Sequence, residues 1–188
     1  MGDIDLAAVR SLKLPRVGQL GFVVNSIEKS LPYYASFYNI GSWFRPNYTE
    51  REFRIGTAPV LMGVDLIVGF SGTTQIELIE TSGQEENLYQ RHLAKNGEGF
   101  HHIGFYVHDF DSRSRAMGEL GLEVLLAGRF KMAGGGVARF AYFDTTQLCG
   151  TILELIEIRL YGIGVPQNTF MYNIAVMTRN AQRTRMRT

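Results

Sequence analysis

Cysteine and long apolar runs are scarce in this sequence, and each scarcity excludes a class of protein. Cys149 is the one cysteine in 188 residues, which excludes an internal disulfide and a cysteine-based zinc site. No apolar run approaches the ~18 residues of a membrane-spanning helix. Residues 1–10 lack the basic-then-apolar order of a signal peptide. We therefore expect a cytoplasmic protein without a membrane partner.

A strong excess of one charge is also lacking, since the formal net charge is +1. Four arginines lie after Met177 with no acidic residue among them: Arg179, Arg183, Arg185 and Arg187. The rest of the chain then holds 15 basic and 18 acidic residues, which argues against a nucleic-acid partner. We expect the arginine tail to be a solvated or disordered end.

The chain contains an internal repeat. The segment Gln19-Leu-Gly-Phe-Val-Val24 matches His102-Ile-Gly-Phe-Tyr-Val107, with Gly, Phe and Val at identical places. A second match links Glu77-Leu-Ile-Glu80 to Glu154-Leu-Ile-Glu157, letter for letter. Both matches occur in the same order and with nearly the same spacing, which predicts a duplicated module.

The periodicity of apolar residues gives each module the same order of elements. In the first module we expect a strand, a helix and three strands, at residues 17–24, 26–38, 42–45, 64–70 and 75–81. The second repeats this order at residues 101–107, 109–121, 122–127, 137–143 and 151–158. Residues 46–62 read as a polar loop and residues 84–96 as a linking helix.

These elements divide the chain into two modules and three other segments. We place the modules at residues 16–81 and 98–158, with an N-terminal extension at 1–15, a linking helix at 82–97 and a C-terminal extension at 159–188. In that extension, alternate residues are apolar: Phe170, Tyr172, Ile174 and Val176. They predict either one more edge strand or a surface that covers a partner subunit.

Four polar side chains fall at corresponding places in the two modules: Gln19, Glu77, His102 and Glu154. Side chains alternate along a strand, so Gly21 and Gly104 lie on the same faces as the glutamine and the histidine and leave open volume beside them. Each polar residue alone is most simply a surface or core side chain. Their common register favours a shared divalent ion, and their oxygen and imidazole donors suit Zn, Ni, Co, Mn or Fe.

The opposite face of the repeated strand carries Glu80 and Glu157. We expect both to be solvated. No Ser/His/Asp or Cys/His nucleophile arrangement stands out, which leaves the metal site as the candidate centre.

The segment from Gly97 to Asp109 resembles the start of the second module in methylmalonyl-CoA epimerases, and Gly150-Thr-Ile-Leu-Glu-Leu-Ile-Glu157 resembles their last strand. Over residues 16–158 the chain is similar to the vicinal-oxygen-chelate superfamily, which includes glyoxalase I, those epimerases, extradiol dioxygenases, and fosfomycin- and bleomycin-resistance proteins. The resemblance implies an α+β fold of two tandem β-α-β-β-β modules forming a barrel or half-barrel, closed within one chain or across a homodimer.

The resemblance assigns the metal ligands to Gln19, Glu77, His102 and Glu154, a set similar to that of eukaryotic glyoxalase I. It implies that Glu154 moves the proton at the metal, with Glu77 as the second candidate for this role. In the epimerases a catalytic glutamate stands three residues after the glycine of a Gly-Val pair, and here Leu66 occupies that place. Asp65 is adjacent but points to the other face.

Candidate substrate contacts form a separate set: Tyr106, Arg129, Lys131, Arg139 and Tyr142. The basic residues surround Ala133-Gly-Gly-Gly136, which we interpret as a flexible loop able to fold over an anion or thioester, although solvated loop charges are the simpler alternative. The glycines precede no helix, so they are not a dinucleotide signature. The aromatic residues allow an aromatic or polyketide-like substrate.

Together these features predict a metal-dependent isomerase, epimerase or lyase that acts on a small oxygen-chelating substrate. Such enzymes transfer a proton through a metal-stabilised enediolate or enolate. The alternative is a non-catalytic ligand-binding or drug-sequestering protein of the same fold, since fold does not fix function. A retained four-ligand set separates the two, because a pure binder has no need of it.

Overall fold

The structure is a computed structural model that describes residues 5–83 and 86–185. Parts of three sequence predictions lie outside these residues: the start of the N-terminal extension, residues 84 and 85 of the linking helix, and Arg187 of the basic tail. No helix within the described ranges has the length and apolarity that crossing a membrane requires.

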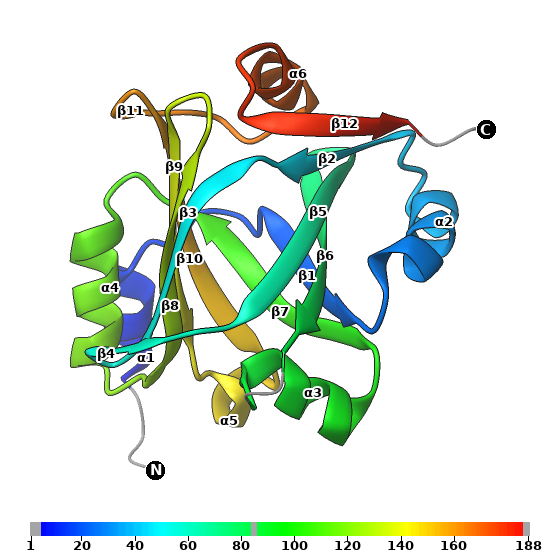
Figure 1. Cartoon of the computed structure of the whole chain (residues 1–188). Helices are drawn as coiled ribbons and strands as arrows, with labels where there is room; N and C mark the ends of the chain where they lie inside the picture. Colours follow the sequence, from blue (N-terminus) through cyan, green and yellow to red (C-terminus); the bar gives the residue numbers. More distant parts are fainter. Residues whose placement is uncertain (1–4, 84–85, 186–188) are drawn as a thin grey trace.

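The two predicted β-α-β-β-β modules are present. The first contains β1 (Gln19–Val24), α2 (Ile27–Phe37), β2 (Ser42–Pro46), β5 (Gly63–Ser71) and β6 (Thr74–Ser82). The second contains β7 (Gly99–Tyr106), α4 (Phe110–Glu119), β8 (Val124–Met132), β9 (Gly136–Phe143) and β10 (Ile152–Leu160). The helix α3 (Leu88–Asn96) links them (Figure 1). The fold class predicted from the repeat is confirmed.

Local sequence sets where the module helices begin and end. The Ser26 hydroxyl accepts a hydrogen bond from the backbone N–H of Lys29 and caps α2, as the sequence predicts. At the end of α4 the chain turns at Gly121, whose φ of +77° favours glycine. Both helices then pack on the outside of the sheet (Figure 1).

The sheet joins the modules edge to edge and then returns to its start. Strands run in the order β2-β5-β6-β1 in one module and β7-β10-β9-β8 in the other, and β1 pairs with β7 antiparallel. The strand β3 (Tyr48–Ile55) pairs with β8, at the far edge of the second module. Because Asn47 alone separates β2 from β3, one stretch of chain runs from the outer strand of the first module to the strand that pairs with the outer edge of the second, and the curled half-barrel is formed by a single chain.

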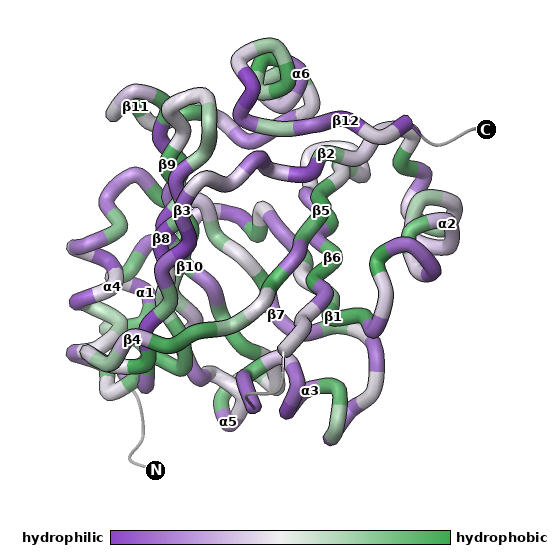
Figure 2. Tube along the Cα trace, in the orientation of Figure 1, coloured by the Kyte–Doolittle hydropathy of each residue, from purple (hydrophilic) through white to green (hydrophobic). Residues whose placement is uncertain are grey.

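Apolar side chains form one interior and two exterior clusters, as the alternation along strands requires. The interior cluster includes Val68, Phe130 and Phe140. One exterior cluster lies under α2 and includes Trp43, and the other lies under α4 and includes Phe143. In Figure 2 hydrophobic segments accordingly alternate with hydrophilic ones along the strands. The interior between the two modules thus contains both an apolar core and the strand faces that carry the candidate ligands.

The predicted polar loop contains strands instead. Both β3 and β4 (Ala58–Val60) lie within residues 46–62. The segment Tyr48–Ile55 is rich in charged residues and mostly exposed, so it lacks the apolar pattern that predicts a strand. Backbone pairing with β8 stabilises this strand. Short elements that we did not predict also include α1 (Leu6–Ser11), α5 (Thr146–Cys149) and β11 (Ile163–Gly164).

The C-terminal extension corrects two further predictions. Residues 170–176 do not form an edge strand but belong to the helix α6 (Thr169–Met177), because Asn168 caps it and nearly every position in it is apolar. The basic tail is solvated but not a disordered end: Ala181–Arg185 form the strand β12, which pairs with β2 while residues 182–185 stay exposed.

Candidate metal centre

Three of the four predicted ligands converge in the barrel interior. Glu77 lies on β6, His102 on β7 and Glu154 on β10, and one donor atom from each lies within 4.8 Å of the others. The Nε2 atom of His102 is 3.0 Å from Oε2 of Glu154 and 3.6 Å from Oε2 of Glu77. All three side chains are buried.

The fourth predicted ligand, Gln19, lies on β1 beside this group. The β1–β7 register places it opposite Gly104 and places His102 opposite Gly21. A Cβ atom at Gly21 would stand 1.9 Å from the His102 ring, and one at Gly104 would stand 2.6 Å from Oε1 of Gln19. Each glycine therefore makes room for the ligand of the other module, which explains the glycine two residues after each ligand.

Unpartnered polar atoms test whether this set fits a cation. Among the described residues, the buried side-chain atoms without a hydrogen-bond partner include Oε1 of Gln19, Nε2 of His102 and Oε2 of Glu154. Unpaired buried polar atoms are costly, so three of them on one predicted ligand set call for a shared partner. Carboxylate, amide and imidazole donors are what a divalent ion of borderline character takes.

Burial shifts the ionisation of the same groups. It raises the pKa of Glu77 well above its usual value, and the charge of Glu154 adds to the rise. Burial also raises the pKa of Glu154, although the hydroxyl of Tyr142 opposes the shift. The pKa of His102 falls to about 3 because its ring is fully buried, so the imidazole is neutral and has a lone pair for a metal.

Gln75 joins the metal site to the rest of the cavity, and the sequence analysis missed it. Its Oε1 accepts hydrogen bonds from Nε2 of Gln19 at 2.8 Å and from the hydroxyl of Tyr106 at 2.6 Å. Its Nε2 donates to the hydroxyl of Tyr172 at 3.2 Å. Because the amide nitrogen of Gln19 is held in this way, its oxygen is left for a cation. The available signal was the position of Gln75 on the same strand face as Glu77.

His101 was also missed as a neighbour of the site. The β1–β7 register shifts between Gly21 and Phe22, so that His101 is an extra residue on β7. Its Nδ1 lies 3.0 Å from Nδ1 of His102, and it is buried beside Tyr89 and Tyr142. The irregularity thus gives the histidine ligand a side-chain neighbour that regular alternation would have placed on the other face.

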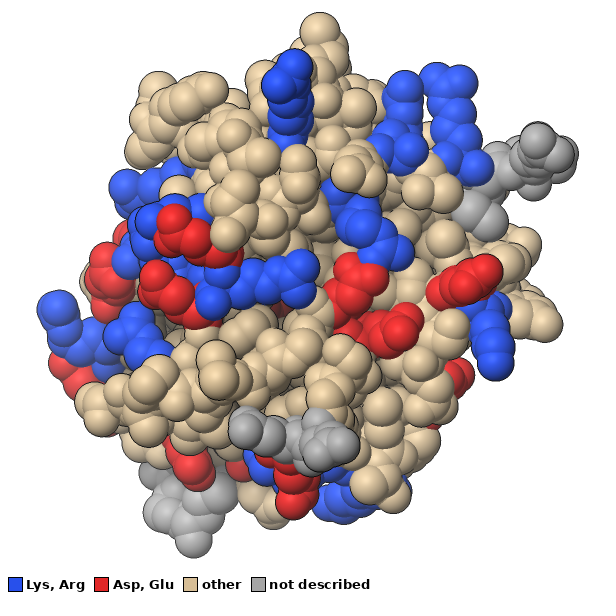
Figure 3. Space-filling view, viewed as in Figure 1, with Lys and Arg blue, Asp and Glu red and all other residues tan. Residues whose placement is uncertain are grey.

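The predicted substrate contacts separate into inner and outer residues. Tyr106 lines the interior cavity, and Tyr142 is buried with its ring centroid 4.8 Å from that of His102. Lys131 pairs with Glu50 at 2.6 Å, and Arg129 lies 4.0 Å from Glu52, both between β8 and β3. Figure 3 shows acidic and basic side chains interspersed over this face. These two basic residues fit the alternative of solvated surface charges.

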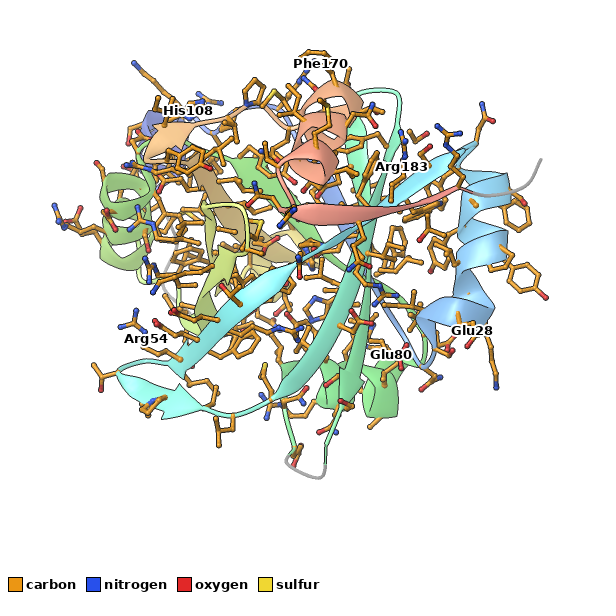
Figure 4. The ribbon with its side chains drawn as sticks, turned by 45° about the horizontal axis from the view of Figure 1, so that its top comes forward. Glu28, Arg54, Glu80, His108, Phe170 and Arg183 are labelled. Carbon is orange, nitrogen blue, oxygen red and sulfur yellow. The ribbon has the colours of Figure 1, made fainter. Side chains whose placement is uncertain are left out.

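Glu157 is buried under α4, where we expected it to be solvated, and pairs with the half-buried Arg139. The Glu157 side chain is 2% exposed and accepts hydrogen bonds from Arg139 and Arg159. Arg139 also bonds Asp111 and lies over the Phe110 ring. The expectation for Glu157 was wrong because α4 and two guanidiniums cover this strand face. Glu80, in contrast, accepts a hydrogen bond from the Ile27 backbone N–H at the start of α2 (Figure 4).

The glycine run is a turn between β8 and β9 that packs against the C-terminal extension. A Cβ atom at Gly134 would stand 1.8 Å from the carbonyl oxygen of Thr178. The side chain of Asn180 accepts a hydrogen bond from the Gly136 N–H and donates one to the Gly134 carbonyl. The interpretation as a flexible loop over a ligand is therefore corrected, because the glycines allow close packing of the chain on itself.

A cavity extends from the ligands to the C-terminal extension. It contains about 900 Å³ of empty space, part of which is open solvent. Gln19, Glu77 and Glu154 line it at one place and Met171 and Tyr172 of α6 at another. Leu66 lines it too, while the neighbouring Asp65 pairs with Arg45, as the alternation predicts.

The structure thus combines two fused β-α-β-β-β modules with a buried cluster of Glu77, His102 and Glu154, and Gln19 lies beside this cluster. The family model of the Glyoxalase/Bleomycin resistance protein/Dioxygenase superfamily matches residues 18–142. The chain belongs to this superfamily, which confirms the resemblance seen in the sequence.

Individual proteins are similar to this chain at low sequence identity. The Bacillus subtilis protein YqjC is 26% identical over 144 residues, which are 76% of this chain and 91% of that protein. The structure of Streptomyces coelicolor methylmalonyl-CoA epimerase in complex with 2-nitronate-propionyl-CoA has a TM-score of 0.54 and 22% identity, covering 76% of this chain and 96% of that chain. The Mycobacterium tuberculosis methylmalonyl-CoA epimerase has a TM-score of 0.53 and 15% identity, with 76% and 87% covered.

Proposed function

We propose that this protein is a divalent-metal-dependent isomerase, epimerase or lyase that transfers a proton on a small oxygen-chelating substrate. One observation carries the proposal. Glu77, His102 and Glu154 come from three strands of two modules, and their donor atoms lie within 4.8 Å of one another in a buried site. A non-catalytic binding protein has no use for such a costly arrangement of buried carboxylates.

Gln19, Glu77, His102 and Glu154 would hold the metal. A divalent ion held there would supply positive charge for the anion left when a proton is removed from the substrate. The chain itself must remove and return the proton, and buried carboxylates with a raised pKa are suited to this near neutral pH.

Glu154 is our first choice for the group that moves the proton, and Glu77 is the second. The β9–β10 register places Tyr142 opposite Glu154, whereas the β5–β6 register places Val68 opposite Glu77. Glu154 thus has a hydroxyl beside it that Glu77 lacks. Leu66, where the epimerases carry a catalytic glutamate, provides no base, so a reaction that uses two bases would need Glu77 as the second one.

Metal analysis and isotope exchange test the proposal. We expect about one divalent ion per chain after purification without chelators, and solvent deuterium uptake into a substrate in D₂O that stops when the metal is removed. Suitable candidates are methylmalonyl-CoA, the methylglyoxal–glutathione adduct and hydroxy-ketones. A protein that neither binds a divalent ion nor changes its ligand binding when one is added would instead be the non-catalytic binder. The cytoplasmic location and the homodimer remain predictions.

A further inference from the structure

The C-terminal extension lies across the cavity that contains the metal site. Met171, Tyr172, Ile174 and Ala175 of α6 line this cavity together with strands of both modules. The Tyr172 ring packs 5.3 Å from the rings of Phe44 and Phe70, measured between centroids. Phe170, on the outer side of the same helix, points away from the barrel (Figure 4). The helix therefore adds an apolar wall to the cavity.

Backbone and side-chain hydrogen bonds hold this wall in place. The strand β12 pairs with β2, and the Asn47 N–H donates to the Asn180 carbonyl at 2.8 Å. The Asn180 side chain is bound to Gly134 and Gly136 of the β8–β9 turn. Because α6 is tied at its end to both modules, the wall is part of the barrel rather than a loose arm.

The cavity lining is mostly apolar, although Arg139, Arg159, Gln167 and Asn180 also contribute to it. Aliphatic and aromatic side chains make up most of it, among them Leu66, Val68, Phe130, Phe140, Ile156 and Met171. Of its three tyrosines, Tyr106 and Tyr172 are hydrogen-bonded through their hydroxyls to Gln75, and Tyr48 is the third. A bound molecule therefore meets mainly carbon atoms beyond the metal site.

The charges near the cavity do not suit an anionic ligand. The basic residues in the lining are Arg139 and Arg159, and both guanidiniums bind Glu157. The acidic residues in it are Glu77 and Glu154, which serve the cation. A coenzyme A thioester carries several phosphate charges and a glutathione adduct carries two carboxylates, so either would have to compete with Glu157 for the Arg139 and Arg159 guanidiniums, which are the cations of this lining.

We infer that the substrate is a compact, uncharged aromatic or alicyclic molecule with two adjacent oxygens, of the hydroxy-ketone class, and that it binds between the metal site and α6. This inference rests on the proposed function. The two oxygens would lie at the metal end, and the ring would lie against the apolar lining. Burial of the ring would supply the affinity that ionic contacts to charged groups supply for a thioester substrate.

The probe for this inference is 2-hydroxyacetophenone, an uncharged aryl hydroxy-ketone with an exchangeable C–H beside its carbonyl. Its binding to the full chain loaded with Zn²⁺ is measured by calorimetry, with coenzyme A and S-lactoylglutathione as charged comparisons. We expect the aryl hydroxy-ketone to bind at least ~10-fold more tightly than hydroxyacetone, which lacks the ring. We expect neither charged molecule to bind or to compete.

A pair of substitutions on α6 locates the binding. Ala175→Trp fills the cavity from the helix and should weaken probe binding at least ~10-fold without changing the Zn²⁺ stoichiometry. Met177→Trp is the matched control, because Met177 is 83% exposed and does not belong to the lining, and its probe binding should match that of the unaltered protein.

The possible failures are distinguishable. A protein that binds no Zn²⁺ contradicts the proposed function. A protein that binds Zn²⁺ together with coenzyme A or the glutathione thioester, or that does not prefer the aryl probe, keeps the proposed function and overturns the inferred substrate class. Equal probe binding by the Ala175→Trp and Met177→Trp variants overturns the location under α6.

Discussion

The two modules have one architecture but provide different surroundings for their metal ligands. In the first, the ligand on the inner strand is Gln19, held by the Gln75 amide, and Glu77 lies opposite Val68. In the second, the corresponding ligand is His102, in contact with His101, and its glutamate lies opposite Tyr142. The repeat thus sets where the candidate ligands lie, and the residues that differ between the modules set their surroundings.

The outer strand faces show the same divergence. Glu80 and Glu157 end the repeated Glu-Leu-Ile-Glu segment, yet one binds the first turn of α2 and the other is a buried partner of two arginines. Identical sequence in a duplicated strand therefore does not imply the same role. What packs on the strand decides that role.

Replacing one glutamate at a time tests the comparison most strongly. Glu154→Gln keeps the shape of the side chain but removes the base, so turnover should fall at least ~10²-fold with the fold retained. Turnover is measured on the substrate identified by deuterium uptake, circular dichroism checks the fold, and metal content is measured on the same sample. Equal turnover by the variant and the unaltered protein would remove Glu154 from the reaction.

Gly21 and Gly104 allow a test of how closely the candidate ligands His102 and Gln19 are packed. Gly21→Ala places a Cβ against the His102 ring, and we expect Zn²⁺ affinity to fall by about 10²-fold because the ligand must move. A Cβ at Gly104 would stand 2.6 Å from Oε1 and 2.9 Å from Cβ of Gln19, a milder clash than the 1.9 Å at Gly21, so the loss for Gly104→Ala should be smaller. Competition with a chromophoric chelator measures both. The reverse ranking would contradict the pairing of glycine and ligand across the modules.

The pH dependence of metal binding reports on the two glutamates. Since burial raises the pKa of both, the metal-free site retains protons that a metal must displace, and affinity should rise with pH. The expected slope is about tenfold per pH unit for each displaced proton, ending once both groups are ionised. His102, with a pKa of about 3, is already neutral above pH 5 and adds no slope. Calorimetric titrations with Zn²⁺ from pH 5.5 to 8 measure it, and a flat profile would contradict the displaced protons.

Gln75 allows a test of the support given to Gln19, the candidate ligand of the first module. Gln75→Leu removes the acceptor of the Gln19 amide, and Zn²⁺ affinity should fall by about tenfold, the scale of losing an outer hydrogen bond to a ligand. Gln75→Glu keeps an acceptor and should restore most of it. The visible spectrum of the Co²⁺-loaded variants reports the ligand geometry directly. A normal spectrum and affinity for Gln75→Leu would show that Gln19 needs no such support.

The smallest effects concern stability. Glu157→Gln leaves two guanidiniums without their carboxylate, and the free energy of unfolding should fall by about 1–2 kcal/mol. Glu80→Gln retains a weaker acceptor for the first turn of α2 and should cost less than about 1 kcal/mol. Urea denaturation of the metal-free proteins measures both. Equal losses would mean that the two outer faces do not differ energetically.

The modules and the cluster of candidate ligands could be predicted from the sequence because each strand occurs twice. Two segments therefore support each assignment of side chains to a strand face. A match such as Gln19 with His102 fixes a register that a single strand leaves open. Segments outside the repeat had no such check. The charged segment that forms β3 was interpreted as a loop. The segment that forms α6 was interpreted as a possible strand because alternate residues are apolar, although most of the residues between them are apolar too.

Other features depend on tertiary contacts that no local pattern reveals. The burial of Glu157 requires α4 and Arg139, and the role of Gln75 requires that β1, β6, β7 and α6 meet. The extra residue at His101 is a property of strand pairing, not of one strand.

The continuous stretch from β2 through Asn47 to β3 also bears on how copies of this protein can associate. Two copies could trade modules only by unpairing β3 from β8 and β1 from β7, and by freeing Asn47 from the Ala133 and Asn180 backbones. These losses would fall on both copies at once. The candidate metal site and its cavity are thus built from a single polypeptide.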